Sequence, residues 1–102
     1  MSILHTVNKS PFERNSLQSC LKFVVPGAAV LLIEDGVYAA LQGSSTGPLV
    51  ADALGRVKIY VLGPDLKARG FAKERLIAGI GVIDYAGFVD LAVEHAKVQA
   101  WL

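Results

Sequence analysis

Apolar residues along this chain gather in four short runs that have the length of β-strands. The run at 28–33 is apolar throughout, which is typical of a strand covered on both faces and predicts a central position in a parallel sheet. Turn-forming residues follow the second and third runs, as Glu34-Asp35-Gly36 and Gly63-Pro64-Asp65. The predicted strands are residues 3–7, 28–33, 58–62 and 81–84.

The segments between these strands show helical spacing. In the first segment the apolar residues recur every three or four positions and form one stripe, and Pro26 with Gly27 ends the helix. Strands that alternate with helices predict an α/β fold in a single domain over residues 1–102. We expect a three-layer sandwich, with an open, mainly parallel sheet of four to five strands and helices on both faces. The predicted helices are 11–25, 37–41, 49–54, a short helix that stops at Gly70, and 85–96.

The junction after the first strand has the residues of a helix start. Ser10 is a good N-cap, Pro11 suits the first helical position, and Glu13 would complete a capping box. In an open parallel sheet the carboxyl ends of the strands usually form the working surface. Asn8 and Lys9 lie at such an end, so we predict that they form a protein-contact loop. The alternatives are simple exposure to solvent and an anion site beside the helix N-terminus, for which the sequence offers no glycine-rich loop.

The composition indicates a surplus of apolar surface. The apolar fraction is 53% and only 19% of the 102 residues are charged, more apolar side chains than one small core hides. We therefore expect a partner surface. The tail 97–102 is unusually apolar for a terminus and contains the only tryptophan, Trp101. It is predicted to dock against this chain or against a partner.

Charge and segment length leave several classes of function without support. The net charge is +1 with basic and acidic residues mixed, so nothing supports direct binding of nucleic acid or of an anionic membrane. The longest apolar segment, 23–33, is interrupted by Pro26 and Gly27 and is too short to span a bilayer. The N-terminus lacks the features of a signal peptide, and we expect a cytoplasmic protein.

Cys20 is the only cysteine, which excludes an internal disulfide and a CxxC motif. As the only thiol it is the only candidate sulfur nucleophile. However, it lies on the apolar stripe of the first predicted helix with no cation nearby, and apolar burial raises the pKa of a thiol. Both interpretations remain open, with a structural core residue favoured. The stripe consists of Leu17, Cys20, Leu21 and Val24.

Structural roles explain the other titratable residues at least as well as catalytic or metal-binding roles do. His5, just before the contact loop, has two interpretations. It either acts as a base or steers a partner's thiol, or it is a polar strand residue satisfied by a neighbouring backbone group, which is the favoured interpretation. His95 near a helix end is predicted to be structural. Acidic residues at the predicted strand ends suggest Mg²⁺, but caps and turns account for them, and we expect no metal or cofactor. Those residues are Glu34, Asp35, Asp65 and Asp84.

Five segments together resemble the TusB/DsrH family, most closely its DsrH branch. The resemblance covers nearly the whole chain in register. It implies a DsrE/F/H-like fold and a sulfur-relay role. The segments are Leu4-His5-Thr6-Val7 with Lys9-Ser10-Pro11-Phe12, 34–40, 62–70, Asp84-Tyr85-Ala86-Gly87-Phe88-Val89 and Gln99-Ala100-Trp101.

The resemblance also implies which subunits are the partners and which of them carries the reactive cysteine. In the DsrH branch, two copies each of DsrE-like, DsrF-like and DsrH-like subunits form a cytoplasmic hexamer that exchanges persulfide sulfur with a DsrC-like carrier during sulfur oxidation. The TusB branch works toward 2-thiouridine in tRNA. The reactive cysteine of the family belongs chiefly to the DsrE or TusD partner, and the comparable turn here, 63–65, has none. This chain is thus expected to be mainly a partner-binding subunit, through His5, Asn8, Lys9 and Trp101.

Overall fold

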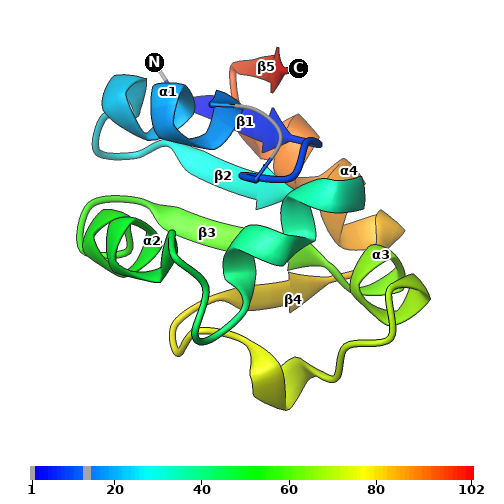
Figure 1. The fold of residues 1–102 in the computed structure, drawn as a ribbon. Coiled ribbons are helices and arrows are strands. Elements are labelled where there is room, and N and C mark those ends of the chain that lie inside the picture. The colour runs from blue at the N-terminus through cyan, green and yellow to red at the C-terminus, as the bar shows by residue number, and fades with distance from the viewer. Residues whose placement is uncertain (1, 13–14) are drawn as a thin grey trace.

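One parallel sheet organises the chain. The computed structural model describes residues 2–12 and 15–102. The strands are β1 (Ile3–Val7), β2 (Ala29–Leu32), β3 (Lys58–Leu62), β4 (Gly81–Ile83) and β5 (Lys97–Trp101). They pair in the order β4-β3-β2-β1-β5, every pair parallel (Figure 1). The four predicted strands are confirmed to within one residue at each end, and the C-terminal tail adds a fifth.

Helical segments connect consecutive strands, as the alternation predicts. Two of them, η1 and η2, are 3-10 helices. Within the described part of the chain, no helix is both long enough and apolar enough to cross a membrane. The segments are α1 (Ser16–Phe23), η1 (Glu34–Ala40), α2 (Gly47–Ala53), α3 (Gly63–Ala68), η2 (Lys73–Arg75) and α4 (Tyr85–Glu94).

The start of the first helix differs from the prediction. Helix α1 begins at Ser16, whereas Pro11 and Phe12 form a turn. The Ser10 hydroxyl accepts a hydrogen bond from the Phe12 amide at 3.2 Å, so it caps that turn and not the helix. A serine side chain can satisfy a turn amide as well as a helix amide, which explains the wrong boundary. The proposed capping box needs Glu13, which lies outside the described residues.

Two segments that were predicted to be turns are instead the first residues of helices. Glu34 to Gly36 begin η1, and Gly63 with Pro64 begins α3 directly after β3. Proline suits this position because its missing N–H would have no partner inside the helix. Asp84 caps α4, its Oδ1 accepting from the Gly87 amide at 2.8 Å.

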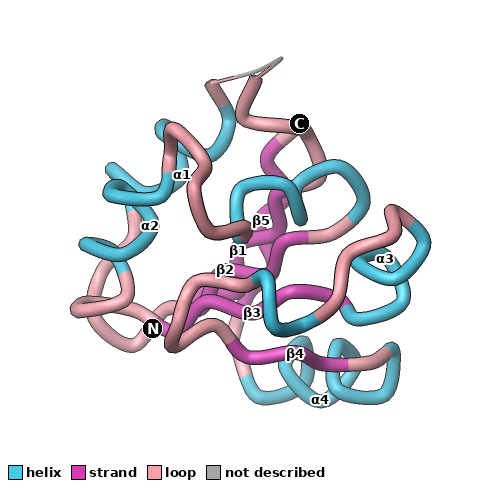
Figure 2. The backbone as a smooth tube through the Cα atoms, turned by 60° about the horizontal axis from the view of Figure 1, so that its bottom comes forward, coloured by secondary structure: helices cyan, strands magenta, loops and turns pink. Residues whose placement is uncertain are grey.

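The two faces of the sheet are covered unequally. On one face, α1, η1, α2 and α3 contribute to the larger core, whose buried residues include Val30 and Val61 of the central strands. On the other face the second core contains residues of one helix, α4, within the described chain. Figure 2 shows α4 on the opposite side of the sheet from α1 and α2. Helices on both faces confirm the three-layer sandwich, and Leu91 is buried on the side of α4 that was predicted to face the core.

The tail docks against its own chain. Strand β5 pairs with β1 along its full length, so that Trp101 lies opposite Val7. The Trp101 indole N–H donates a hydrogen bond to His5 Nδ1 at 3.0 Å, and its ring lies 5.7 Å from the Phe23 ring. His5 is only 4% exposed, so it is the buried, satisfied histidine of the second interpretation. Its partner is a side chain, however, and not the backbone group that was expected.

We predict that stability falls as the pH drops below the ordinary histidine range. Burial lowers the pKa of His5 below 6.5, and the indole N–H needs an unprotonated Nδ1 as its acceptor. The folded state therefore binds a proton less readily than the unfolded chain. This contribution is complete above the unfolded pKa near 6.5 and is lost progressively as the pH falls below it. The free energy of unfolding in urea, measured at intervals of about one pH unit between pH 8 and pH 5, tests this prediction.

The variant His5→Gln serves as the test of this assignment. It removes the titrating ring, so its unfolding free energy should change less over the same pH interval. The matched control, His95→Gln, keeps His5 and should retain the wild-type fall. Equal pH profiles for wild type and His5→Gln would contradict the prediction.

Candidate partner-binding site at the carboxyl edge

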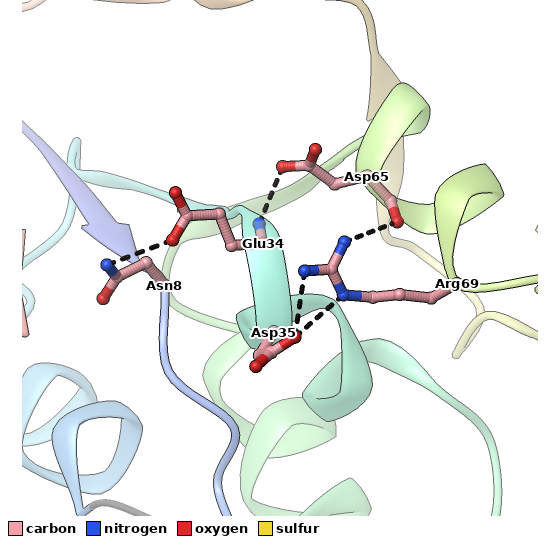
Figure 3. Close-up of polar contacts among 5 residues, drawn as sticks. All are labelled: Asn8, Glu34, Asp35, Asp65 and Arg69. Atoms are coloured by element: carbon pink, nitrogen blue, oxygen red, sulfur yellow. Dashed lines mark hydrogen bonds and ion pairs between the residues drawn. The ribbon is translucent and has the colours of Figure 1, made fainter.

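Polar side chains from three neighbouring strands meet at one edge of the sheet. Asn8 directly follows β1, Glu34 and Asp35 follow β2, and Asp65 and Arg69 follow β3 on and after α3. Parallel strands end on the same side, so these five residues come together (Figure 3). We call Asn8, Glu34, Asp35, Asp65 and Arg69 the carboxyl-edge cluster. Lys9 is next to it in sequence and partly exposed.

Glu34 is held in an unusual backbone conformation. Its φ angle is +50°, in the left-handed region that costs a non-glycine residue about 1–2 kcal/mol. Two contacts oppose this cost. The Glu34 amide donates to Asp65 Oδ2 at 2.7 Å, and Asn8 Nδ2 donates to Glu34 Oε2 at 3.3 Å. Side chains from two adjacent connections thus orient Glu34, whose own side chain is exposed.

An ion pair between Asp35 and Arg69 connects η1 to the end of α3. Arg69 Nε and Nη2 both lie 2.9 Å from Asp35 Oδ1, and Nη1 donates to the Asp65 carbonyl at 3.1 Å. Such a partly exposed pair contributes at most about 1 kcal/mol to stability. Its effect is mainly geometric, because it uses three guanidinium nitrogens to hold two connections in one arrangement.

Gly36 lets η1 pack directly on the end of β1. A Cβ built on Gly36 would overlap the carbonyl oxygen of Val7. The same carbonyl accepts a hydrogen bond from the Ile33 amide at 3.0 Å. The close approach requires glycine for space, not for its φ angle. The sequence pattern around Gly36 predicts only the end of a strand and does not reveal this role, since a close backbone approach leaves no local pattern.

The acidic residues of the edge are engaged by protein groups. Asp35 binds Arg69, Asp65 binds the Glu34 amide, and Asp84 caps α4. In the part of the chain that the structure describes, no group of three or more His, Cys, Asp or Glu side chains is placed to hold a metal ion. These three carboxylates are occupied by hydrogen bonds and an ion pair within the chain. Asn8 Oδ1 is buried and accepts no hydrogen bond from the described residues.

Cys20 lies apart from this edge. It is fully buried in the larger core on α1, as the apolar stripe predicts. Burial raises the pKa of its thiol to about 12. At neutral pH the thiol is therefore protonated, and a protonated, inaccessible thiol is a poor nucleophile. Of the predicted site residues, the structure brings Asn8 and Lys9 to the edge, with Trp101 beside them opposite Val7, whereas His5 and Cys20 are buried.

The fold and the carboxyl edge of the sheet define a class of protein. It is a small three-layer α/β domain with polar side chains at that edge and a buried cysteine. A family model described as DsrH like protein matches residues 9–98, and the chain belongs to this family. The family resemblance seen in the sequence is thereby confirmed.

Curated relatives match along the whole chain. Protein TusB of Pectobacterium parmentieri is 42% identical over 100 residues, which span 97% of this chain and 100% of that protein. Protein TusB of Erwinia tasmaniensis is 40% identical over 99 residues, with 97% and 100% covered. These relatives bear the TusB name although the motifs resembled the DsrH branch most.

Solved structures share the fold at low identity. The ychN protein from E. coli superposes with a TM-score of 0.83 at 18% identity, covering 98% of each chain. A protein of Methanobacterium thermoautotrophicum superposes with a TM-score of 0.74 at 18% identity, covering 96% of each chain. At this identity the likeness shows the fold alone, and it confirms the predicted fold class.

We predict that Gly36→Ala strongly destabilises the protein. The new methyl group would collide with the Val7 carbonyl, and a backbone atom in a sheet cannot move aside without breaking strand pairing. The expected cost is on the order of 3 kcal/mol. Chemical denaturation of the purified variant measures it.

Gly47→Ala is the matched control. Gly47 is the first residue of α2, and the nearest atom to a Cβ there is Ile77 Cδ1 at 4.0 Å. Alanine should change stability by less than about 1 kcal/mol and in the stabilising direction. Equal effects of the two substitutions would refute the close-approach argument.

Proposed function

We propose that this chain is a TusB-type subunit of a cytoplasmic sulfur-relay complex that supplies sulfur for 2-thiouridine in tRNA. Its part is to bind partner subunits, and the sulfur is carried on a cysteine of a partner. The observation that carries the proposal is the full-length similarity to proteins named TusB, at 42% and 40% identity. Membership of the DsrH-like family supports the same role.

The burial of Cys20 supports a subunit that does not carry sulfur. Persulfide transfer needs a thiolate that reaches the sulfur of another protein. Cys20 has no exposed surface, and its thiol pKa is raised to about 12. Deprotonating and exposing it would require opening the core between α1 and the sheet.

The carboxyl-edge cluster supports a partner-binding role. Glu34 presents an exposed carboxylate from a backbone conformation that contacts with two neighbouring residues, Asn8 and Asp65, stabilise. Strained residues that their surroundings hold in place are characteristic of functional positions. Lys9 and Trp101 lie beside the same edge. The surface therefore offers a partner the cation of Lys9, the carboxylate of Glu34 and the partly exposed ring of Trp101. DsrE-like and DsrF-like subunits, two copies of each in a hexamer, are the proposed partners.

The description of the matching family model as DsrH-like favours a second candidate. In this alternative the chain belongs to a DsrEFH-type hexamer that exchanges persulfide sulfur with a DsrC-like carrier in sulfur oxidation. The two candidates share the subunit role and differ in the acceptor of the sulfur.

Deleting the gene in the source organism separates the candidates. Nucleoside mass spectrometry of total tRNA should show loss of 2-thiouridine, and a plasmid copy should restore it. If 2-thiouridine is unchanged while the oxidation of stored sulfur is impaired, the sulfur-oxidation alternative replaces the main proposal.

We predict that the edge residues are needed for assembly. Lys9→Gln and Glu34→Gln remove one charge each at the edge and should weaken co-purification of partner subunits about tenfold, as expected for a charge contact in an interface. The control variants Lys73→Gln and Glu74→Gln make the same changes on the exposed segment η2. If all four variants assemble equally well, the edge is not the partner surface.

We predict that Cys20→Ala retains sulfur transfer. The variant should lose on the order of 1 kcal/mol of stability to the small cavity, because Cys20 is buried in the core. Cys20→Ser should behave similarly if its hydroxyl donates to the Ser16 carbonyl one turn earlier. Both should assemble and pass persulfide at near wild-type rates, which intact-mass measurement of the loaded complex would record.

A folded, assembled Cys20→Ala complex that transfers sulfur tenfold more slowly would have lost about 1.4 kcal/mol of transition-state stabilisation. That result would make Cys20 a relay site and overturn the non-carrier role.

A further inference from the structure

Strand β5 forms an open edge of the sheet. It pairs with β1 on one side, and within the described chain no strand pairs with its other side. In Figure 1 it lies at the outer end of the sheet. Its first four residues are exposed, including Val98 at 48% and the small side chain of Ala100. An edge strand without proline or a bulge is a template for pairing with another strand.

The residues of β5 fall into two sets that face opposite sides of the sheet. Lys97, Gln99 and Trp101 alternate with Val98 and Ala100. Trp101 contacts Phe23 of α1, so the first set lies on the α1 side. Val98 and Ala100 lie on the α4 side, in register with Leu4 and Thr6 of β1.

The order of these side chains makes the strand complementary to an antiparallel copy of itself. When two copies pair about Gln99, Gln99 faces Gln99, Val98 faces Ala100, and Lys97 faces Trp101, all on matching sides of the sheet. A lysine beside an indole gains a cation–π contact, and paired amides exchange hydrogen bonds. No like charges face each other, and all five strand residues have partners.

We propose that β5 is a self-association surface, at which a second copy of this chain adds its own β5 antiparallel about a two-fold axis through Gln99. The pairing joins two five-stranded sheets into one continuous sheet. The opposite edge strand, β4, has only three residues and offers a shorter template. The proposal does not depend on the sulfur-relay function, since it concerns the chain alone.

Shifting the register by one residue toward either terminus weakens the match. Pairing centred on Val98 places Gln99 opposite Lys97 and brings Trp101 opposite His95, outside the strand. Pairing centred on Ala100 leaves Lys97 beyond the end of the partner strand. The register centred on Gln99 is therefore the one that pairs the whole strand and brings each charged or aromatic side chain to a favourable neighbour.

Charge variants at the symmetry centre test the proposal. Gln99→Lys and Gln99→Glu each place like charges opposite each other across the axis. Each should weaken self-association of the purified chain about tenfold in sedimentation equilibrium, whereas an equimolar mixture of the two should associate at least as tightly as wild type. Gln18→Lys, at an exposed position on α1, is the matched control and should associate like wild type.

Circular dichroism and thermal melting of each variant check that it folds. If one Gln99 variant is unfolded, the comparison of the other with the control still decides the matter. A wild-type chain that sediments as a monomer throughout the micromolar range overturns the proposal. So does a dimer that neither Gln99 variant weakens, since such a dimer uses another surface.

Discussion

The carbonyl oxygen of Val7 is the point on which the carboxyl edge depends. It accepts the Ile33 amide at 3.0 Å, and Gly36 packs against it where no side chain fits. Because Gly36 leaves room here, η1 lies against the end of β1, with Glu34 and Asp35 beside the residues that follow β3. The hydrogen bonds of Asp65 and Arg69 stabilise this arrangement. The electrostatic contacts of the edge therefore require a close backbone approach that only glycine allows.

Burial has the same chemical effect on the two titratable side chains of the interior. Desolvation favours the neutral form, so it lowers the pKa of His5 and raises the pKa of Cys20 to about 12. A neutral His5 accepts a hydrogen bond from the Trp101 indole N–H, which connects β5 to β1. A neutral Cys20 behaves as a small apolar core residue. The interior therefore stabilises the fold, whereas Glu34 at the carboxyl edge and the first four residues of β5 are exposed.

The helix that covers the smaller core also carries exposed apolar residues. The larger core has contributions from four helical segments, and the smaller core depends on α4. Tyr85, Val89 and Val93 of α4 remain at least 60% exposed. These residues account for part of the apolar surplus that the composition indicates.

The sequence by itself determined the alternation of strands and helices, the central position of 28–33 and the burial of Cys20, because apolar periodicity directly reflects which side chains leave water. The residues that follow strands were also identified as an edge, since parallel strands end together. Three features were decided only by the tertiary structure. Ser10 caps a turn and not α1, His5 is satisfied by Trp101 from 96 residues away, and Glu34 takes a left-handed conformation. Each depends either on groups that are distant in sequence or on local alternatives of similar energy. A local sequence pattern does not show which distant group makes the contact.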